Sequence, residues 1–236
     1  MNEALVLARV KTQLRIKRLT DDLRRSATKD VLTKLPNRLS FEEILAKEWP
    51  RAVSSGREIG LMMFELDHFE AYVERYGHAA ADQTVRKVAQ VLRRTTDHPA
   101  HYLARIYRST FAILMPETSQ EQAERMAWAA MNGIEKLGIE HATSTTSMHV
   151  TTSAGLSVYD RACSGWAEPD QAAEGRRENP HCDATDLRNC ASEALAKAKR
   201  NGGGQAWWMD MGRDLAKLRA QEILPALGAL EMQAVA

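Results

Sequence analysis

Residues 59–67, Ile-Gly-Leu-Met-Met-Phe-Glu-Leu-Asp, decide the fold class of this chain of 236 residues. The run from Ile59 to Phe64 is almost continuously apolar and has the length of a strand. It lacks the alternation of apolar and polar residues that is typical of a strand with one solvent-exposed face. It therefore predicts a central strand that is covered on both sides. The run ends in Glu65-Leu66-Asp67, which puts two carboxylates directly after its apolar part.

Helix and strand patterns alternate on both sides of this run. Upstream, Ser40 and Glu43 form a capping-box pattern that predicts the start of an amphipathic helix, and Pro50 predicts its end. Downstream, the pattern predicts helices at 82–95, 120–137 and 185–201, and strands at 102–106, 110–115, 149–158 and 205–209. Residues 161–185 are charged and rich in Gly and Pro, which predicts a long surface loop. The order predicts an α/β domain with a central mixed sheet flanked by helices.

The two ends of the chain differ from this pattern. Residues 1–27 lack Gly and Pro and carry a narrow apolar stripe, which predicts a helix that pairs in a coiled coil. The alternative is a solvated helix that folds back on its own domain. Residues 28–209 form the predicted domain, and residues 210–236 form a predicted C-terminal helical extension.

The composition excludes several classes of protein. Lys and Arg number 32 and Asp and Glu number 31, so the total charge of +1 gives no argument for a nucleic-acid or membrane partner. No apolar run approaches the ~20 residues of a membrane helix. The three cysteines are scattered and form no CxxC pair, so we expect a reducing, cytoplasmic location.

Four motifs, in order along the chain, resemble those of the GGDEF family of diguanylate cyclases. They are Asp30-Val-Leu-Thr-Lys-Leu-Pro-Asn-Arg38, Glu65-Leu-Asp-His-Phe-Glu70, Tyr76-Gly-His78 with Asp82, and Ala194-Leu195 with Ala198-Lys199. The resemblance implies the GGDEF-type sheet and the family's activity, in which two GTP molecules on a dimer become cyclic di-GMP with the help of Mg²⁺. The N-terminal helix is similar to the linker that follows a response-regulator receiver domain.

The signature loop of the family is altered. Ala104-Arg-Ile-Tyr-Arg-Ser-Thr-Phe111 aligns with the family's A-R-Y-G-G-E-E-F. Tyr107 and Arg108 therefore stand where two glycines let the backbone approach the nucleotide, and Ser109 and Thr110 stand where two carboxylates are expected. The resemblance implies an obstructed phosphate site, and these four residues become candidates for an interaction surface.

The resemblance also implies changes at the metal and phosphate positions. Ser109 and Glu65 replace two metal-ligating acidic residues. A hydroxyl lacks the negative charge, and the longer Glu side chain moves its oxygens by more than ~1 Å, which Mg²⁺ tolerates poorly. Glu70 replaces a phosphate-facing Lys and brings a like charge toward a triphosphate. We therefore expect no cofactor, and a role for Mg²⁺ through a vestigial Glu65 only if nucleotide binding persists.

The nucleotide-reading positions are partly kept. Val73 replaces an Asn that reads guanine, and Gly203 replaces an Arg, whereas Asp82 and Lys199 match the family pattern. The resemblance therefore leaves Asp82, Lys199 and Asp67 as candidates for vestigial nucleotide binding.

The family's product-inhibition motif, R-x-x-D, aligns with His98-Pro-Ala-His101. Neither imidazole reproduces the planar fork of a guanidinium, so we expect no product site and interpret both as surface histidines.

Structural roles compete with these functional ones. Asp30 with Arg38 is interpreted as a turn pair, and Asp67 as a hydrogen-bonded residue of the fold. Asp82 could begin a helix as its N-cap, and Lys199 could be a solvated lysine on a helix flank.

The sequence thus favours a catalytically inactive GGDEF-like domain that acts as a regulatory or protein-interaction module in bacterial signal transduction. It is expected to form a homodimer through the N-terminal helix and to bind a signalling protein. The first alternative is an allosteric module that binds GTP or a related nucleotide. The second is a residual cyclase that makes cyclic di-GMP from GTP.

Overall fold

The structure is a computed structural model that describes residues 28–96, 98–160 and 182–211, together with Arg9, Thr12, Gln13, Arg15, Lys17 and Asp214. Three predictions therefore lie outside the described residues, wholly or for the most part. They are the coiled coil of residues 1–27, the loop of residues 161–185 and the helical extension after residue 210.

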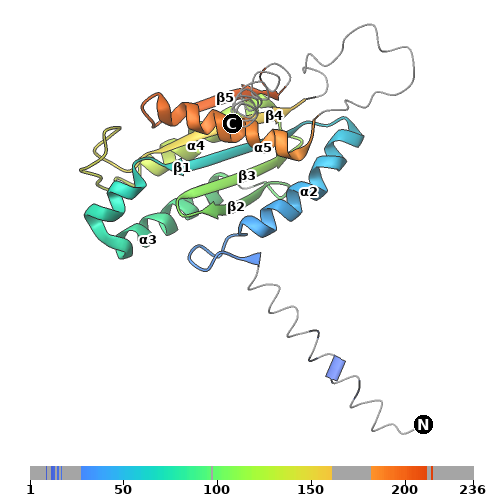
Figure 1. Ribbon diagram of the computed structural model, residues 1–236, viewed down its shortest axis with the longest axis horizontal. Coiled ribbons are helices and arrows are strands. Elements are labelled where there is room, and N and C mark those ends of the chain that lie inside the picture. Colours follow the sequence, from blue (N-terminus) through green and yellow to red (C-terminus); the bar gives the residue numbers. More distant parts are fainter. Residues whose placement is uncertain are drawn as a thin grey trace, which may run out of the picture.

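Five strands form one mixed sheet in the order β2-β3-β1-β4-β5 (Figure 1). β1 (Ile59–Leu66) runs antiparallel to β3 (Thr110–Pro116) on one side and to β4 (Thr152–Tyr159) on the other. β2 (Tyr102–Tyr107) forms a hairpin with β3, and β5 (Ala206–Asp210) pairs with β4 in parallel. The predicted hairpin and the predicted central position of the 59–66 strand are both confirmed.

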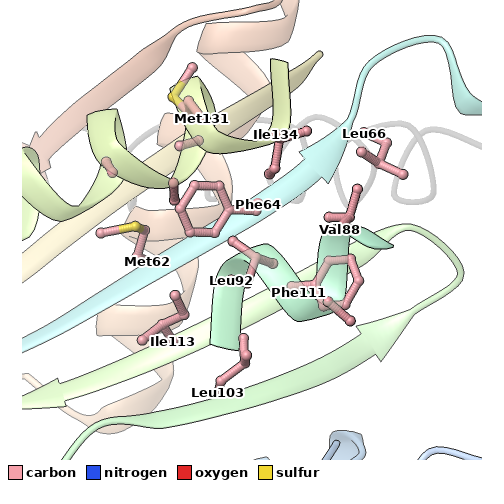
Figure 2. Close-up of a cluster of buried hydrophobic side chains, with 14 of the residues drawn as sticks. Met62, Phe64, Leu66, Val88, Leu92, Leu103, Phe111, Ile113, Met131 and Ile134 are labelled. Carbon is pink, nitrogen blue, oxygen red and sulfur yellow. The ribbon is translucent and has the colours of Figure 1, made fainter. Parts of the chain in front are cut away.

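Helices cover both faces of the sheet (Figure 1). α3 (Phe69–Thr95) and α4 (Gln120–Glu135) share one hydrophobic core with the sheet, and α2 (Arg38–Ser55) and α5 (Ala184–Arg200) share a second. Figure 2 shows the first core, in which Phe64 of β1 lies among side chains of α3, α4 and β3. Successive residues of a strand point to opposite faces, so Leu61 packs in the second core and Phe64 in the first. Among the residues that the structure describes, no helix is long and apolar enough to cross a bilayer.

α2 differs from the prediction at both ends. Its N-cap is Asn37, whose side-chain oxygen accepts a hydrogen bond from the N–H of Ser40 at 3.1 Å, so Ser40 lies inside the helix. The helix also continues through Pro50 to Ser55. A proline inside a helix costs about 3 kcal/mol. Trp49 and Ala52 are buried on either side of it, and this packing keeps the segment helical.

α3 differs from the prediction because it begins at Phe69 rather than at Asp82. The backbone is non-helical at Gly77, with φ 80° and ψ 166°, which divides α3 into two parts at a kink. The hydroxyls of Tyr72 and Thr84 are 3.0 Å apart and join the two parts. Asp82 lies after the kink inside the helix with an exposed side chain, so its interpretation as an N-cap was wrong.

Candidate functional site

The predicted site residues come from four elements that meet at one end of the sheet. β1 ends there, α3 begins there, and the β2–β3 turn and the end of α5 lie beside them. Glu65 on β1 faces Thr110 across one strand pair and Ser153 across the other. The side chain of Asp82, on the second part of α3, is exposed.

Glu65 is joined to Lys199 of α5 by an ion pair. The side chains are 29% and 39% exposed, so this pair lies at the rim of the site. α5 comes this close because it packs on Gly155 of β4, where an added Cβ would lie 2.2 Å from the carbonyl oxygen of Ala191. Lys199 is therefore ion-paired, while its side chain stays partly exposed to solvent.

Asp67 is buried and fully engaged by the protein itself. Its carboxylate accepts hydrogen bonds from the hydroxyls of Thr151 at 2.7 Å and Ser153 at 2.6 Å, and from the backbone N–H of Gly204 at 2.9 Å. Only 3% of the residue is exposed. Asp67 is thus a hydrogen-bonded residue of the fold. The three donors were missed in the sequence because they lie 84 to 137 residues away and carry no local pattern.

Gly203 stands in a position that has no room for a side chain. Its φ is +74°, and an added Cβ would lie 2.9 Å from the hydroxyl oxygen of Thr146 and 3.0 Å from Oδ1 of Asp67. Thr146 is itself fixed, because its hydroxyl donates to the carbonyl of Gly202 at 2.8 Å. Thr146 and Asp67 therefore occupy the space that the Cβ of an Arg side chain at position 203 would need.

The turn between β2 and β3 divides into an exposed and a buried part. Tyr107 is 67% exposed, and Arg108, with φ +28°, forms an ion pair with Glu70 at 3.1 Å. Ser109 is buried, and its carbonyl accepts a hydrogen bond from the N–H of Leu66 at 3.3 Å. Thr110 begins β3. Of the four signature-loop candidates, Tyr107 and Arg108 thus present the larger part of the accessible surface.

Asp30 is paired with Arg105 rather than with Arg38. One guanidinium nitrogen of Arg105 lies 2.9 and 3.0 Å from the two carboxylate oxygens of Asp30. Arg38 instead lies 4.0 Å from Glu42 on the surface of α2. Burial by itself raises the pKa of Asp30, but hydrogen bonds from Thr33 and Arg105 outweigh it and lower that pKa below its ordinary value. The predicted turn pair was therefore wrong in its partner.

The remaining predicted positions differ in their burial. Val73 is half-buried and packs against the first core. His98 is exposed, as the prediction of a surface histidine required, whereas His101 is half-buried. The Nε2 atom of His101 lies 3.0 Å from the hydroxyl of Thr118. Burial, together with the neighbouring His98, lowers the pKa of His101.

Three acidic side chains at this end of the sheet have partners within the protein. Asp67 has three donors, Glu65 has Lys199, and Glu70 has Arg108. Among the described residues, no three His, Cys, Asp or Glu side chains converge in an arrangement that could hold a metal ion.

The sheet order, the helix pairs on its two faces and the hairpin turn beside the end of β1 define a GGDEF-type α/β domain. The family model for the diguanylate cyclase GGDEF domain matches residues 27–170, and the chain belongs to that family.

Two relatives illustrate the sequence similarity. The diguanylate cyclase DgcP from Pseudomonas aeruginosa is 29% identical over 182 residues, which are 77% of this chain and 24% of that protein. The response regulator PleD from Caulobacter vibrioides is 30% identical over 161 residues, which are 64% of this chain and 35% of that protein. The chain therefore spans between a quarter and about a third of the length of these relatives.

Solved structures show the same fold. The coiled coil and GGDEF domain of DgcB from Caulobacter crescentus, in complex with c-di-GMP, superposes with a TM-score of 0.72 at 22% identity and covers 88% of this chain and 98% of that one. The diguanylate cyclase SiaD in complex with its activator SiaC from Pseudomonas aeruginosa gives a TM-score of 0.63 at 21% identity and covers 88% of this chain and 71% of that one. At these identities the likeness is one of fold.

Proposed function

We propose that this chain is a catalytically inactive GGDEF domain that acts as a regulatory or protein-interaction module in cyclic-di-GMP signal transduction. The observation that carries the proposal is the ion pair between Glu65 and Lys199. It neutralises the carboxylate that stands at a metal position of the family, and it involves the lysine that stands at a phosphate position.

The residues present do not fit Mg²⁺. The ion requires several oxygen ligands in a near-ideal octahedron, with carboxylates to supply negative charge. Ser109 contributes a neutral hydroxyl and is buried, and Glu65 lies against an ammonium group. We therefore assign no step to a metal ion.

The residues at the positions that would face the triphosphate and the base of a nucleotide also support the proposal. Glu70 carries a negative charge where a cation is needed, and its partner Arg108 occupies a glycine position. Gly203 cannot regain an arginine without displacing Thr146 and Asp67. Val73 packs on the core and offers no hydrogen bond to a guanine edge.

The proposed module acts in the cytoplasm as a homodimer that is held by the N-terminal helix, and it presents the Tyr107–Arg108 turn to a signalling protein. The exposure of Tyr107 supports this surface, because exposed aromatic residues are enriched at protein interfaces.

The decisive experiment is an assay for cyclic di-GMP, formed from GTP and Mg²⁺ by the unmodified chain at high concentration. An active diguanylate cyclase serves as the positive control. We expect no product. Turnover that is abolished by Glu65→Ala would overturn the proposal.

A thermal-shift series with GTP, ATP and cyclic di-GMP tests the nucleotide-sensing alternative. A ligand that binds only the folded state raises stability by about 2.7 kcal/mol at 100 times its Kd. We expect no shift with any of the three. A saturable shift with GTP that Lys199→Ala removes would contradict the interaction-module proposal in favour of nucleotide sensing.

A further inference from the structure

A hollow of about 290 Å³ lies between α4 and the starts of β4 and β5. α4 contributes Trp128, Met131, Asn132 and Glu135 to its lining. Thr151 and Thr152 come from the start of β4, and Gly204 comes from the segment before β5. The volume is at the lower end of the ~300–1,000 Å³ found for small-molecule sites, so an occupant must be small.

Three of the four lining residues from α4 form one polar and aromatic stripe along the helix. Positions 128, 132 and 135 follow the i, i+4, i+7 spacing that places side chains on one helix face. Trp128 is 58% exposed, although burial of an aromatic side chain is strongly favourable. The fold therefore leaves an indole face available at the rim of the hollow.

The polar lining offers several hydrogen-bond acceptors beside the amide of Asn132. The hydroxyl of Thr151 donates its proton to Asp67 at 2.7 Å, and that of Thr152 donates to the carbonyl of Glu65 at 2.8 Å. Each hydroxyl has a single proton, so its oxygen can offer lone pairs to a ligand. Within the described residues, the carboxylate of Glu135 makes no ion pair. Arg125, one turn before Trp128, is paired with Glu121 instead.

We propose that this hollow binds a small organic cation with several N–H donors, of the alkylguanidinium or alkylammonium class. The carboxylate of Glu135 supplies the opposite charge, Thr151 and Thr152 accept hydrogen bonds, and the indole of Trp128 provides a face for a cation–π contact. Glu65 and Lys199 are not among the lining residues, and the proposal does not rest on the absence of cyclase activity.

Calorimetric titration of the full chain with agmatine tests the proposal, with neutral n-butylurea as an uncharged probe that has the same four-carbon chain. We expect saturable binding of agmatine and none of n-butylurea. Glu135→Gln and Trp128→Ala should each weaken binding at least about tenfold, whereas Trp128→Phe should keep most of it because an aromatic face remains. Glu124→Gln, on the same helix but outside the lining, is the control and should leave the affinity unchanged.

Three results would overturn the proposal. They are no binding of agmatine at millimolar concentration, equal binding of n-butylurea, and equal affinity of the Glu135→Gln variant. Binding of acetyl-arginine amide without binding of agmatine would instead assign the hollow to an arginine of a protein segment and would likewise overturn the small-cation proposal. The circular dichroism spectrum of each variant establishes that it is folded.

Discussion

The ammonium group of Lys199 on α5 pairs with the carboxylate of Glu65 on β1, although 134 residues separate them in the sequence. The pair connects the last turn of a helix to the end of the central strand.

We expect this pair to contribute only modestly to stability, because both side chains are partly exposed. A double-mutant cycle with Glu65→Gln and Lys199→Met, followed by urea unfolding, should give a coupling free energy of about 0.2–1 kcal/mol. The coupling should shrink in 1 M salt, where the Debye length is about 3 Å. Strictly additive effects of the two substitutions at low salt would contradict the prediction.

Replacement of Asp67 should be far more destabilising. Asp67→Asn turns one acceptor oxygen of a buried group into a donor that faces other donors, so we expect a loss of about 1–3 kcal/mol in the free energy of unfolding. Asp82→Asn, at an exposed position of α3, is the control and should change that free energy by less than about 0.5 kcal/mol. Similar effects of the two variants would show that the hydrogen bonds of Asp67 are dispensable.

The lack of room for a side chain at Gly203 can be tested by comparison with a second glycine, Gly138. Gly203 and Gly138 have φ values of +74° and +57°, but only at Gly203 would a Cβ meet other atoms within 4 Å. Both alanine variants should therefore lose about 1 kcal/mol through backbone strain. Gly203→Ala should lose at least about 1 kcal/mol more through steric overlap. Equal losses, measured by chemical denaturation, would mean that Thr146 and Asp67 can move aside.

The pair between Asp30 and Arg105 predicts a pH dependence of stability. The pKa of Asp30 in the folded chain lies below its ordinary value of 3.8, so folding favours the charged form. The stabilisation is complete well above pH 3.8 and is lost as the pH falls through the folded-state pKa. Asp30→Asn should therefore cost about 1–3 kcal/mol at pH 6 and progressively less below pH 3.8. Urea unfolding of both proteins at a series of pH values measures this difference. A difference that stays constant from pH 6 to pH 3 would contradict it.

The N-terminal segment should determine the oligomeric state. Its narrow apolar stripe gains more as a seam between two helices than on the surface of a monomer. Deletion of residues 1–25 should leave a folded monomer, whereas the full chain should be a dimer, with masses measured by multi-angle light scattering. The same mass for both forms would refute dimerisation through this segment.

The sequence by itself determined the fold and the family. Burial on both faces of a strand requires a continuous apolar run, so residues 59–64 sufficed to place β1 in the centre of the sheet. The hairpin of β2 and β3 and the starts of α4 and α5 followed from local periodicity in the same way. These features are local. They depend on residues that are close together in the sequence and therefore also close together in the structure.

Only the tertiary structure decided which charges meet and which local rules are overridden. The partner of Asp30 is Arg105, 75 residues away, rather than the nearer Arg38, and the donors to Asp67 come from two distant segments. Pro50 lies within a helix because Trp49 and Ala52 are packed on the sheet. The physical reason is common to these cases. Hydrogen bonds, ion pairs and apolar burial across the fold depend on which segments are brought together, and that choice is made by the packing of the whole domain.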